Sequence, residues 1–158
     1  MTTRLKNVEL DPAKAVAEAE RLHELGYNCA ESLCGAVVTA AGQEPPPLRL
    51  ASAFGGGMGR TGEVCGVLTG ALIGLGWLFG RDRPEDKESY ARVAAMGRRL
   101  LDGFRAQHGT LDCSTLTGYD LSDPAVLADF AADGERRRKC AEFIRSAARL
   151  AAAAAQDA

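Results

Sequence analysis

The uncharged run over residues 64–80, VCGVLTGALIGLGWLFG, constrains the fold of this chain more than any other segment. A stretch of this length without a charged side chain belongs in a protein core or in a membrane. Gly66, Gly70 and Gly74 recur at every fourth position, which places them on one helix face and lets a second helix approach closely. Because the run is short for a membrane span and rich in glycine, we expect a buried central helix and no membrane span.

Length and charge predict one ordinary globular domain over residues 1–158. The chain is 46% apolar and 25% charged, which is typical of a soluble protein with a single core. Its formal net charge of -2 gives no electrostatic reason to expect a nucleic-acid partner. The first eleven residues are polar and mixed in charge, without the features of a targeting peptide, so we expect a cytoplasmic location.

Helical periodicity dominates the chain, and alternating β-branched runs are almost absent. We therefore predict an all-α, single-domain helical bundle with a glycine-rich loop leading into the buried central helix. Capping residues, acidic first turns and glycine stops set the expected bounds. The expected helices are 11–25, 28–42, 61–80, 84–109, 125–133 and 135–154; the expected linkers are 43–50 and 111–124; residues 1–10 and 151–158 are expected to fray.

The glycine-rich segment over residues 55–62, GGGMGRTG, contains a G-x-G-x-x-G spacing at Gly57, Gly59 and Gly62. In dinucleotide-binding proteins this spacing follows a parallel strand and opens a βαβ unit. The preceding LRLASAF is a poor strand, and no second strand is present to complete the unit. We therefore expect the glycines to supply backbone freedom and exposed amides beside the start of the central helix, where Cys65 lies.

The five cysteines are Cys29, Cys34, Cys65, Cys113 and Cys140. In a reducing compartment, cysteines serve as metal ligands or redox thiols more often than as structural disulfides. No two of them have a short zinc-ligand spacing, and no C-x-x-C-H haem attachment is present. A shared site must therefore be assembled by the fold from distant segments. Cys29 and Cys34 point roughly 140° apart on one helix, so we expect one of them to lie outside the site. Cys34 lacks the helix-start position, so we assign it to packing and keep Cys29.

Four of these cysteines, in their sequence contexts, resemble the C_GCAxxG_C_C family of redox-active proteins, small domains defined by four cysteines and a C-G-A-x-x-G motif. The matching segments are GYNCAESL with Cys29, FGGGMGRTGEVCGVLTG with Cys65, LDCSTLTGYDL with Cys113 and KCAEFIRSAA with Cys140. The chain departs from the motif at Val67, where the family has alanine. Cys34 lies outside the four-cysteine pattern, in agreement with its assignment to packing.

The resemblance implies a redox or electron-transfer protein. A related domain occurs in split-Soret cytochromes, where four such cysteines are thought to hold an iron–sulfur cluster beside haem. By this likeness, an iron–sulfur cluster is ligated by Cys29, Cys65, Cys113 and Cys140, with Gly55, Gly56, Gly57, Gly59 and Gly62 wrapped around it. We also expect a redox partner protein and a homodimer.

Three alternatives stay open from the sequence alone. In the first, the cysteines cycle between thiol and disulfide without a metal, and Cys65 is the attacking thiol because a helix start lowers its pKa. Arg60 would assist if its side chain folded back, but we expect it to be a solvated surface charge. In the second, the same four thiolates hold zinc as a structural staple. In the third, the cysteines only support a helical binding module. Metal content distinguishes the cluster from these three alternatives.

Overall fold

The computed structural model describes residues 8–156, a chain of helices joined by turns and loops, with no strand in that part and one isolated β-bridge between Val64 and Asp112. The helices are α1 (Pro12–Glu24), α2 (Cys29–Ala40), the 3-10 helix η1 (Leu48–Phe54), α3 (Gly66–Phe79), α4 (Lys87–His108), α5 (Cys113–Thr117), α6 (Val126–Ala132) and α7 (Gly134–Gln156). The prediction of an all-α fold is confirmed.

Local capping signals set the starts of the first two helices. The Asp11 side chain accepts hydrogen bonds from the first amides of α1, and Pro12 occupies the first position of that helix. Asn28 and Glu31 form a reciprocal capping box at the start of α2. Both starts lie where the sequence predicts them, so Cys29 is held at the first position of a well-defined helix.

The central helix α3 packs against α2 through its glycine face, in the most extensive contact between two elements. A Cβ atom at Gly70 would overlap the carbonyl oxygen of Ala30, and one at Gly74 would lie 2.9 Å from Val37. Gly66 also lies close to the start of α2, with its ideal Cβ position 3.2 Å from the Ala30 nitrogen. The expected close approach of a second helix to the three glycines is confirmed, and it fixes the starts of α2 and α3 side by side.

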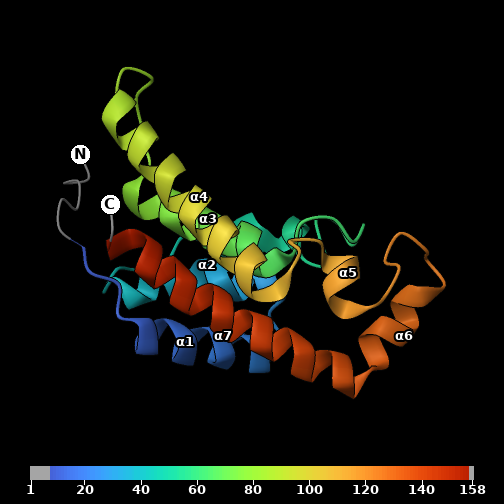
Figure 1. Ribbon diagram of the computed structural model, residues 1–158. Helices are drawn as coiled ribbons and strands as arrows, with labels where there is room; N and C mark the ends of the chain where they lie inside the picture. The colour runs from blue at the N-terminus through green and yellow to red at the C-terminus, as the bar shows by residue number, and fades with distance from the viewer. Residues whose placement is uncertain (1–7, 157–158) are drawn as a thin grey trace.

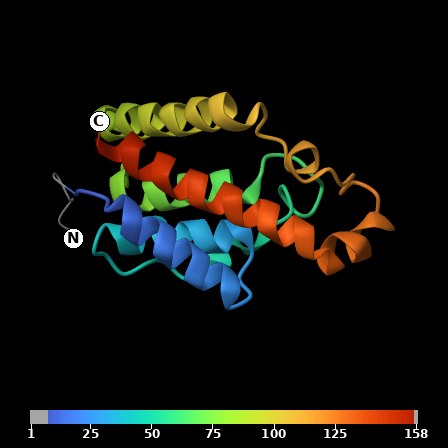
Figure 2. The ribbon, with the colours of Figure 1, turned by 60° about the horizontal axis from the view of Figure 1, so that its bottom comes forward.

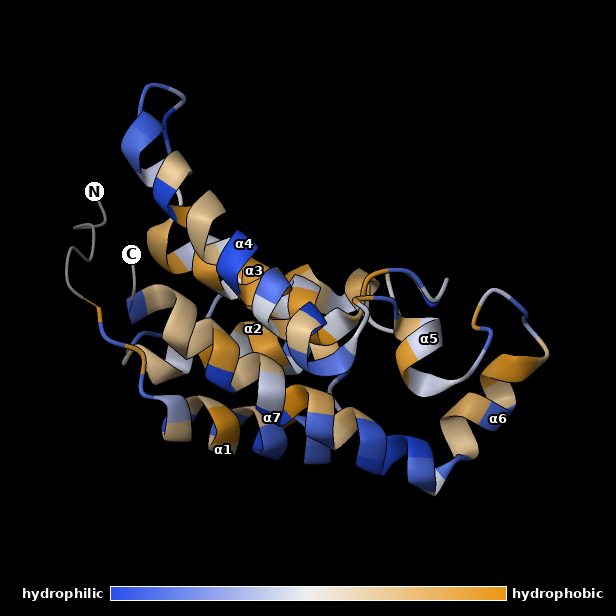
Figure 3. Ribbon diagram, in the orientation of Figure 1, coloured by the Kyte–Doolittle hydropathy of each residue, from blue (hydrophilic) through white to orange (hydrophobic). Residues whose placement is uncertain are grey.

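The long helices α4 and α7 pack against each other and complete the bundle, with α4 on α3 and with α7 on α1, α2 and α3. Figure 1 shows α7 running the length of the molecule, and the turned view in Figure 2 shows it between α4 and α1. Glu20 of α1 forms an ion pair with Arg145 of α7 at 2.8 Å, and the Arg99 guanidinium of α4 donates to the Ala154 carbonyl at 2.7 Å. Hydrophobic residues line the middle of the bundle, whereas the first turns of α7 are strongly hydrophilic (Figure 3).

Several boundaries differ from those expected. The central helix begins at Gly66 rather than near residue 61, because residues 62–65 are held in an extended turn against the segment 111–114. The short helix α5 lies within the expected loop 111–124, and η1 includes part of the expected linker 43–50. Helix α7 continues to Gln156 with buried alanines in its last turns, which differs from the fraying expected over 151–156; residues 1–7, 157 and 158 lie outside the described part.

The end of the segment 1–10, which was expected to fray, is also ordered, because Leu10 is fully buried in the core. Within residues 8–156, none of the helices combines the length and the apolar character that a bilayer crossing requires. The uncharged run instead forms α3, most of whose residues are buried or half-buried inside the bundle.

Candidate functional site: a four-cysteine centre beside a cationic cavity

Four cysteines lie at or near the starts of four helices. Cys29 and Cys113 are the first residues of α2 and α5, Cys65 is the N-cap of α3, and Cys140 lies in the early turns of α7. These starts meet at the end of the bundle that carries α5 and α6 (Figures 1 and 2). The fold thus brings together segments that are far apart in the sequence, as the four-cysteine hypothesis requires.

Backbone pairing between two loops joins Cys65 to Cys113. The Cys65 amide donates to the Leu111 carbonyl at 2.8 Å, and the Cys113 amide donates to the Glu63 carbonyl at 2.8 Å. These two bonds are the antiparallel bridge between Val64 and Asp112, and they form a short clamp between the loops. The clamp brings the two side chains close together, so that the Cys113 thiol raises the pKa of Cys65.

The second pair, Cys29 and Cys140, joins the start of α2 to α7. The Cys140 thiol lies close enough to Cys29 to raise the pKa of Cys29. Gly66 connects the two pairs, because its ideal Cβ position lies 3.3 Å from the Cys29 Cβ atom, directly after Cys65 in the chain. The charges of Cys65 and Cys113, when ionised, also act on Cys29, which shows that the two pairs are neighbours.

The thiols of Cys29 and Cys65 are poor acids in this setting. Donation to Cys140 raises the pKa of Cys29 well above its usual value, and burial adds to this effect. Donation to Cys113 and burial raise the pKa of Cys65 in the same way, although the Val67 amide at the start of α3 opposes the shift. The prediction that its helix-start position lowers the pKa of Cys65 is therefore wrong, because one favourable amide is outweighed by the neighbouring thiol and by burial.

The pKa of Cys140 is shifted downward, in contrast to those of Cys29 and Cys65. The hydrogen bond from Cys29 lowers the pKa of Cys140 to about 7, against the opposing effect of burial, and the charge and hydrogen bond of Arg136 lower it further. Arg136 stands four residues before Cys140 on α7, with its guanidinium 4.3 Å above the centroid of the Phe130 ring. Sequence analysis missed Arg136, although an arginine one helical turn before a cysteine is a readable signal.

Cys34 lies apart from the four-cysteine centre. It is fully buried in a small cluster with Ala30 and Ala51, against Phe54 and Ile73. Burial alone raises its pKa to about 11. Its assignment to packing is confirmed.

The glycine loop contacts the centre with part of its length. At Gly57 the φ angle is +74°, and an added Cβ would lie 2.7 Å from the Cβ of Cys113. At Gly62, whose φ is +79°, an added Cβ would overlap the Ser114 hydroxyl. These two glycines therefore let the loop pack closely against the start of α5, while Gly55, Gly56 and Gly59 line a cavity on the other side of the loop.

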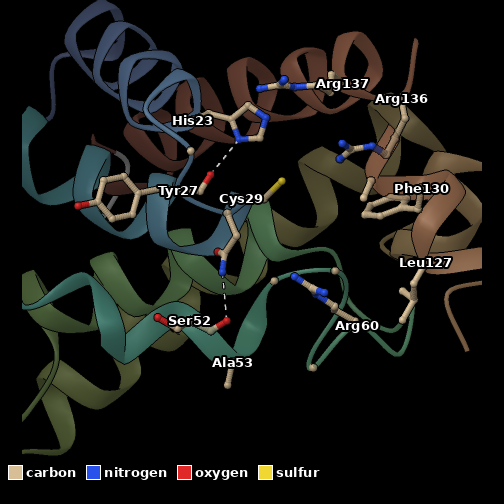
Figure 4. Close-up of a pocket in the computed structure, with 16 residues that line it drawn as sticks. His23, Tyr27, Cys29, Ser52, Ala53, Arg60, Leu127, Phe130, Arg136 and Arg137 are labelled. Atoms are coloured by element: carbon tan, nitrogen blue, oxygen red, sulfur yellow. Dashed lines mark hydrogen bonds between the residues drawn. The ribbon is translucent and has the colours of Figure 1, made fainter. Parts of the chain in front are cut away.

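This cavity has a volume of about 560 Å³ and opens beside Cys29 (Figure 4). Three arginines line it: Arg60 from the glycine loop, and Arg136 and Arg137 from α7. The remaining lining residues come from the α1–α2 corner, η1, the glycine loop and α6: His23, Gly26, Tyr27, Asn28, Cys29, Ser52, Ala53, Gly55, Gly56, Gly59, Leu127, Phe130 and Ala131. In Figure 4 the Cys29 sulfur points toward the space between the His23 ring and the guanidinium groups of Arg60 and Arg136.

All five cysteines carry free thiols. Among residues 8–156, no group of three or more His, Cys, Asp or Glu side chains is arranged so that it could hold a metal ion. The thiols instead form two adjacent pairs, an arrangement that suits either a centre with two metal atoms or the formation of two disulfides.

A family model described as "Putative redox-active protein (C_GCAxxG_C_C)" matches residues 27–154. The chain belongs to this family. The C_GCAxxG_C_C match includes Cys29, Cys65, Cys113 and Cys140, and it agrees with the resemblance seen in the sequence. Neither a curated protein nor a solved structure matches the chain.

Proposed function

We propose that this protein is an electron-transfer protein whose four paired cysteines ligate an iron–sulfur cluster of two irons. The observation that supports this proposal is the pairing itself: Cys29 with Cys140, and Cys65 with Cys113. In a [2Fe–2S] centre each iron takes two thiolates, so two adjacent thiol pairs match its ligand set. When bound, such a centre supplies the transfer of one electron at a time.

The surrounding residues fit an anionic centre of this kind. Cys65, Cys113 and Cys140 are each about 95% buried, so the protein excludes water from most of the site. Arg136 supplies a positive charge beside Cys140. The Val67 amide also points at the sulfur of Cys65. These groups stabilise thiolate charge, which cluster ligands must carry.

Anaerobic purification after expression with added iron tests the cluster. We expect visible absorption with two irons and two sulfides per chain, the content of one [2Fe–2S] centre. The matched variants are Cys65→Ala, which removes one proposed ligand, and Cys34→Ala, which removes the buried cysteine outside the group. Iron should be lost in the first and retained in the second. Colourless protein without iron and sulfide contradicts the proposal, and one zinc per chain selects the structural zinc staple instead.

Thiol–disulfide chemistry at Cys29 and Cys140 is the second candidate, favoured by the lowered pKa of Cys140 and by the position of Cys29 at the cavity. The Cys140 thiolate attacks a disulfide, forms a mixed disulfide and releases one thiolate. Cys29 then loses its proton and attacks the Cys140 sulfur, which releases the second thiol and leaves a Cys29–Cys140 disulfide. The substrate disulfide is reduced, and an external dithiol must restore the protein. In this mechanism Cys140 replaces Cys65 as the attacking thiol.

Mass spectrometry of metal-free protein exposed to oxidised glutathione tests this second candidate. We expect a Cys29–Cys140 disulfide to form first, and a glutathione adduct to accumulate on Cys140 in the Cys29→Ala variant. A first disulfide between Cys65 and Cys113, or no adduct on Cys140, contradicts it.

A homodimer, a cytoplasmic location and a redox partner protein stay predictions from the sequence, and light scattering of the purified protein tests the dimer.

A further inference from the structure

The lining of the cavity beside Cys29 is positively charged, and the nearby Glu24 carboxylate acts on His23. Arg60, Arg136 and Arg137 line the cavity, and none of its lining residues, all within the described part of the chain, is Asp or Glu. The carboxylate that acts on Arg136 is that of Asp133, which already accepts hydrogen bonds from the Tyr119 hydroxyl at 2.5 Å and the Glu135 amide at 2.9 Å. Three guanidinium groups around one hollow favour an anion, because guanidinium binds carboxylate and phosphate in a forked geometry.

Two buried polar atoms on residues that line the cavity have no hydrogen-bond partner among the described residues: Nε2 of His23 and Nε of Arg136. Buried polar atoms in folded proteins nearly always have a partner, so each of these atoms points to a missing ligand or water. The Nδ1 atom of His23 lies 3.3 Å from the Tyr27 carbonyl oxygen, which only accepts, so Nδ1 carries the proton. Burial lowers the pKa of His23, which favours the neutral ring and leaves Nε2 as an acceptor.

The part of the cavity wall that α6 contributes is apolar. Its lining residues are Leu127, Phe130 and Ala131. The Phe130 ring is held by an edge contact with Tyr119 at 5.6 Å between centroids and by Arg136 above it. A volume of about 560 Å³ is within the range of small-molecule sites, which combine apolar walls with a few placed polar groups.

We propose that this cavity binds a small organic anion, with its carboxylate or phosphate group at Arg60, Arg136 and Arg137, a hydrogen-bond donor at His23 and an apolar part against Phe130. A molecule bound in this way lies against Cys29 of the four-cysteine centre. The site goes beyond the proposed redox function, because binding requires neither a metal nor a thiol reaction.

Calorimetry on the anaerobically purified full chain tests the site with four kinds of probe: phenyl phosphate, benzoate, the hydroxybenzoate isomers and inorganic phosphate. We expect the better of phenyl phosphate and benzoate to bind about tenfold more tightly than inorganic phosphate, because only these probes fill the apolar wall. Their order distinguishes a phosphate ligand from a carboxylate ligand. If inorganic phosphate binds as tightly as phenyl phosphate and benzoate, the proposal that the ligand has an apolar organic part is overturned. If none of the probes binds, the proposed anion site itself is overturned.

Two double variants with the same change in net charge separate the cavity from the general field of the protein. Arg60→Gln with Arg137→Gln removes two cations from the cavity, whereas Arg49→Gln with Arg138→Gln removes two exposed cations that do not line it. We expect the first variant to weaken binding about tenfold, because it loses a charge-assisted hydrogen bond to the anion. The second variant should weaken binding by less than about twofold. Equal weakening in both variants overturns the assignment.

The His23→Phe variant tests the donor position, because it keeps a ring and removes the acceptor. The best hydroxybenzoate isomer should bind more tightly than benzoate in the unchanged protein and lose that advantage in the variant. An advantage that survives in His23→Phe, or is absent in the unchanged protein, overturns this part. Iron and sulfide are measured on the same samples, so failure of the cluster and failure of the anion site are separate results.

Discussion

Gly57 and Gly59 show how the surroundings of a single residue decide its tolerance to change. Both have a left-handed backbone, with φ of +74° and +69°. An added Cβ at Gly57 would meet Cys113 and Glu63 at 2.7 Å, whereas at Gly59 the nearest atom is the Ala53 carbonyl oxygen at 4.0 Å. Alanine at either position costs about 1 kcal/mol of left-handed strain, and only at Gly57 does overpacking add about 1–3 kcal/mol.

We therefore expect Gly57→Ala to lower the free energy of unfolding by more than Gly59→Ala, by at least about 1 kcal/mol. Urea denaturation of the two reduced variants beside the unchanged protein measures the difference. Equal destabilisation would show that the loop moves away from Cys113 without cost, and that Gly57 does not need to be glycine for packing.

Arg136 is the residue that couples the cysteine centre to the cavity. Its cation and its hydrogen bond stabilise the Cys140 thiolate, so removing the charge favours the neutral thiol. In metal-free, reduced protein, Arg136→Gln should raise the pKa of Cys140 from about 7 toward the usual thiol value. Ultraviolet absorbance of the thiolate during a pH titration measures this shift. The control is Arg138→Gln on the same helix, and a shift of the same size in the control would contradict the assignment.

At the scale of elements, the contact between α2 and α3 depends on one glycine face. Alanine at Gly70 would overlap the Ala30 carbonyl, and because both partners are helix backbone, relief requires the helices to separate. Gly76 on the same helix has no atom within 4 Å of an added Cβ, so alanine there only improves helix propensity. We expect Gly70→Ala to destabilise the protein by about 3 kcal/mol or more and Gly76→Ala to stabilise it by up to about 1 kcal/mol.

Thermal unfolding of these two variants is the measurement. Gly70→Ala should also reduce iron content, since it shifts Cys29 and Cys65 relative to one another, whereas Gly76→Ala should not. A Gly70→Ala protein as stable as the original would mean that α2 and α3 separate at little cost, contrary to the packing described above.

Local sequence signals predicted elements well where a cap is encoded nearby. Asp11 and Asn28 mark the starts of α1 and α2 without reference to the rest of the chain. Helix α5 had comparable signals, since the Asp112 side chain caps it and Gly118 ends it in a left-handed conformation, but they lie in a stretch rich in turn residues. The start of α3 was not predictable, because it is set by hydrogen bonds from residues 62–65 to a segment nearly fifty positions later.

At the scale of the whole molecule, sequence reasoning identified which cysteines belong together but not how they pair. The helix-face argument separated Cys34 from Cys29 because both lie on one helix. The pairing of Cys65 with Cys113 depends on the loop clamp, and that of Cys29 with Cys140 on how α7 packs against α2. The cationic cavity was equally out of reach, because its arginines come from a loop and a helix that meet only in the folded chain.

The buried thiols make the free energy of unfolding of the metal-free, reduced protein depend on pH. In the unfolded chain, cysteines ionise near pH 8.5. The pKa values of Cys29, Cys34 and Cys65 are raised in the folded state, so these thiols stay protonated there while the unfolded chain loses protons. Their stabilising contribution is therefore fully present below about pH 8.5 and is lost as pH rises, by up to about 1.4 kcal/mol per thiol for each pH unit.

Cys140 has the opposite effect on stability, over a lower pH range. Its folded pKa of about 7 is below the unfolded value, so its contribution is present above about pH 8.5 and is lost as pH falls through about 7. The two effects predict a stability maximum near pH 8, with a fall on the alkaline side. Urea denaturation with reductant and chelator, at about pH 8 and about pH 9.5, should show a lower midpoint at the higher pH.

Cys34→Ala supplies the matched control for this pH dependence, because it removes one thiol with a raised pKa and leaves the four-cysteine centre intact. In this variant the loss of stability between about pH 8 and about pH 9.5 should be smaller by the contribution of one thiol. The comparison also cancels the ionisation of lysine and tyrosine, which both proteins share. A midpoint that rises between these two pH values, or a loss unchanged by Cys34→Ala, would show that the buried thiols already ionise in the folded protein and that burial does not hold them neutral.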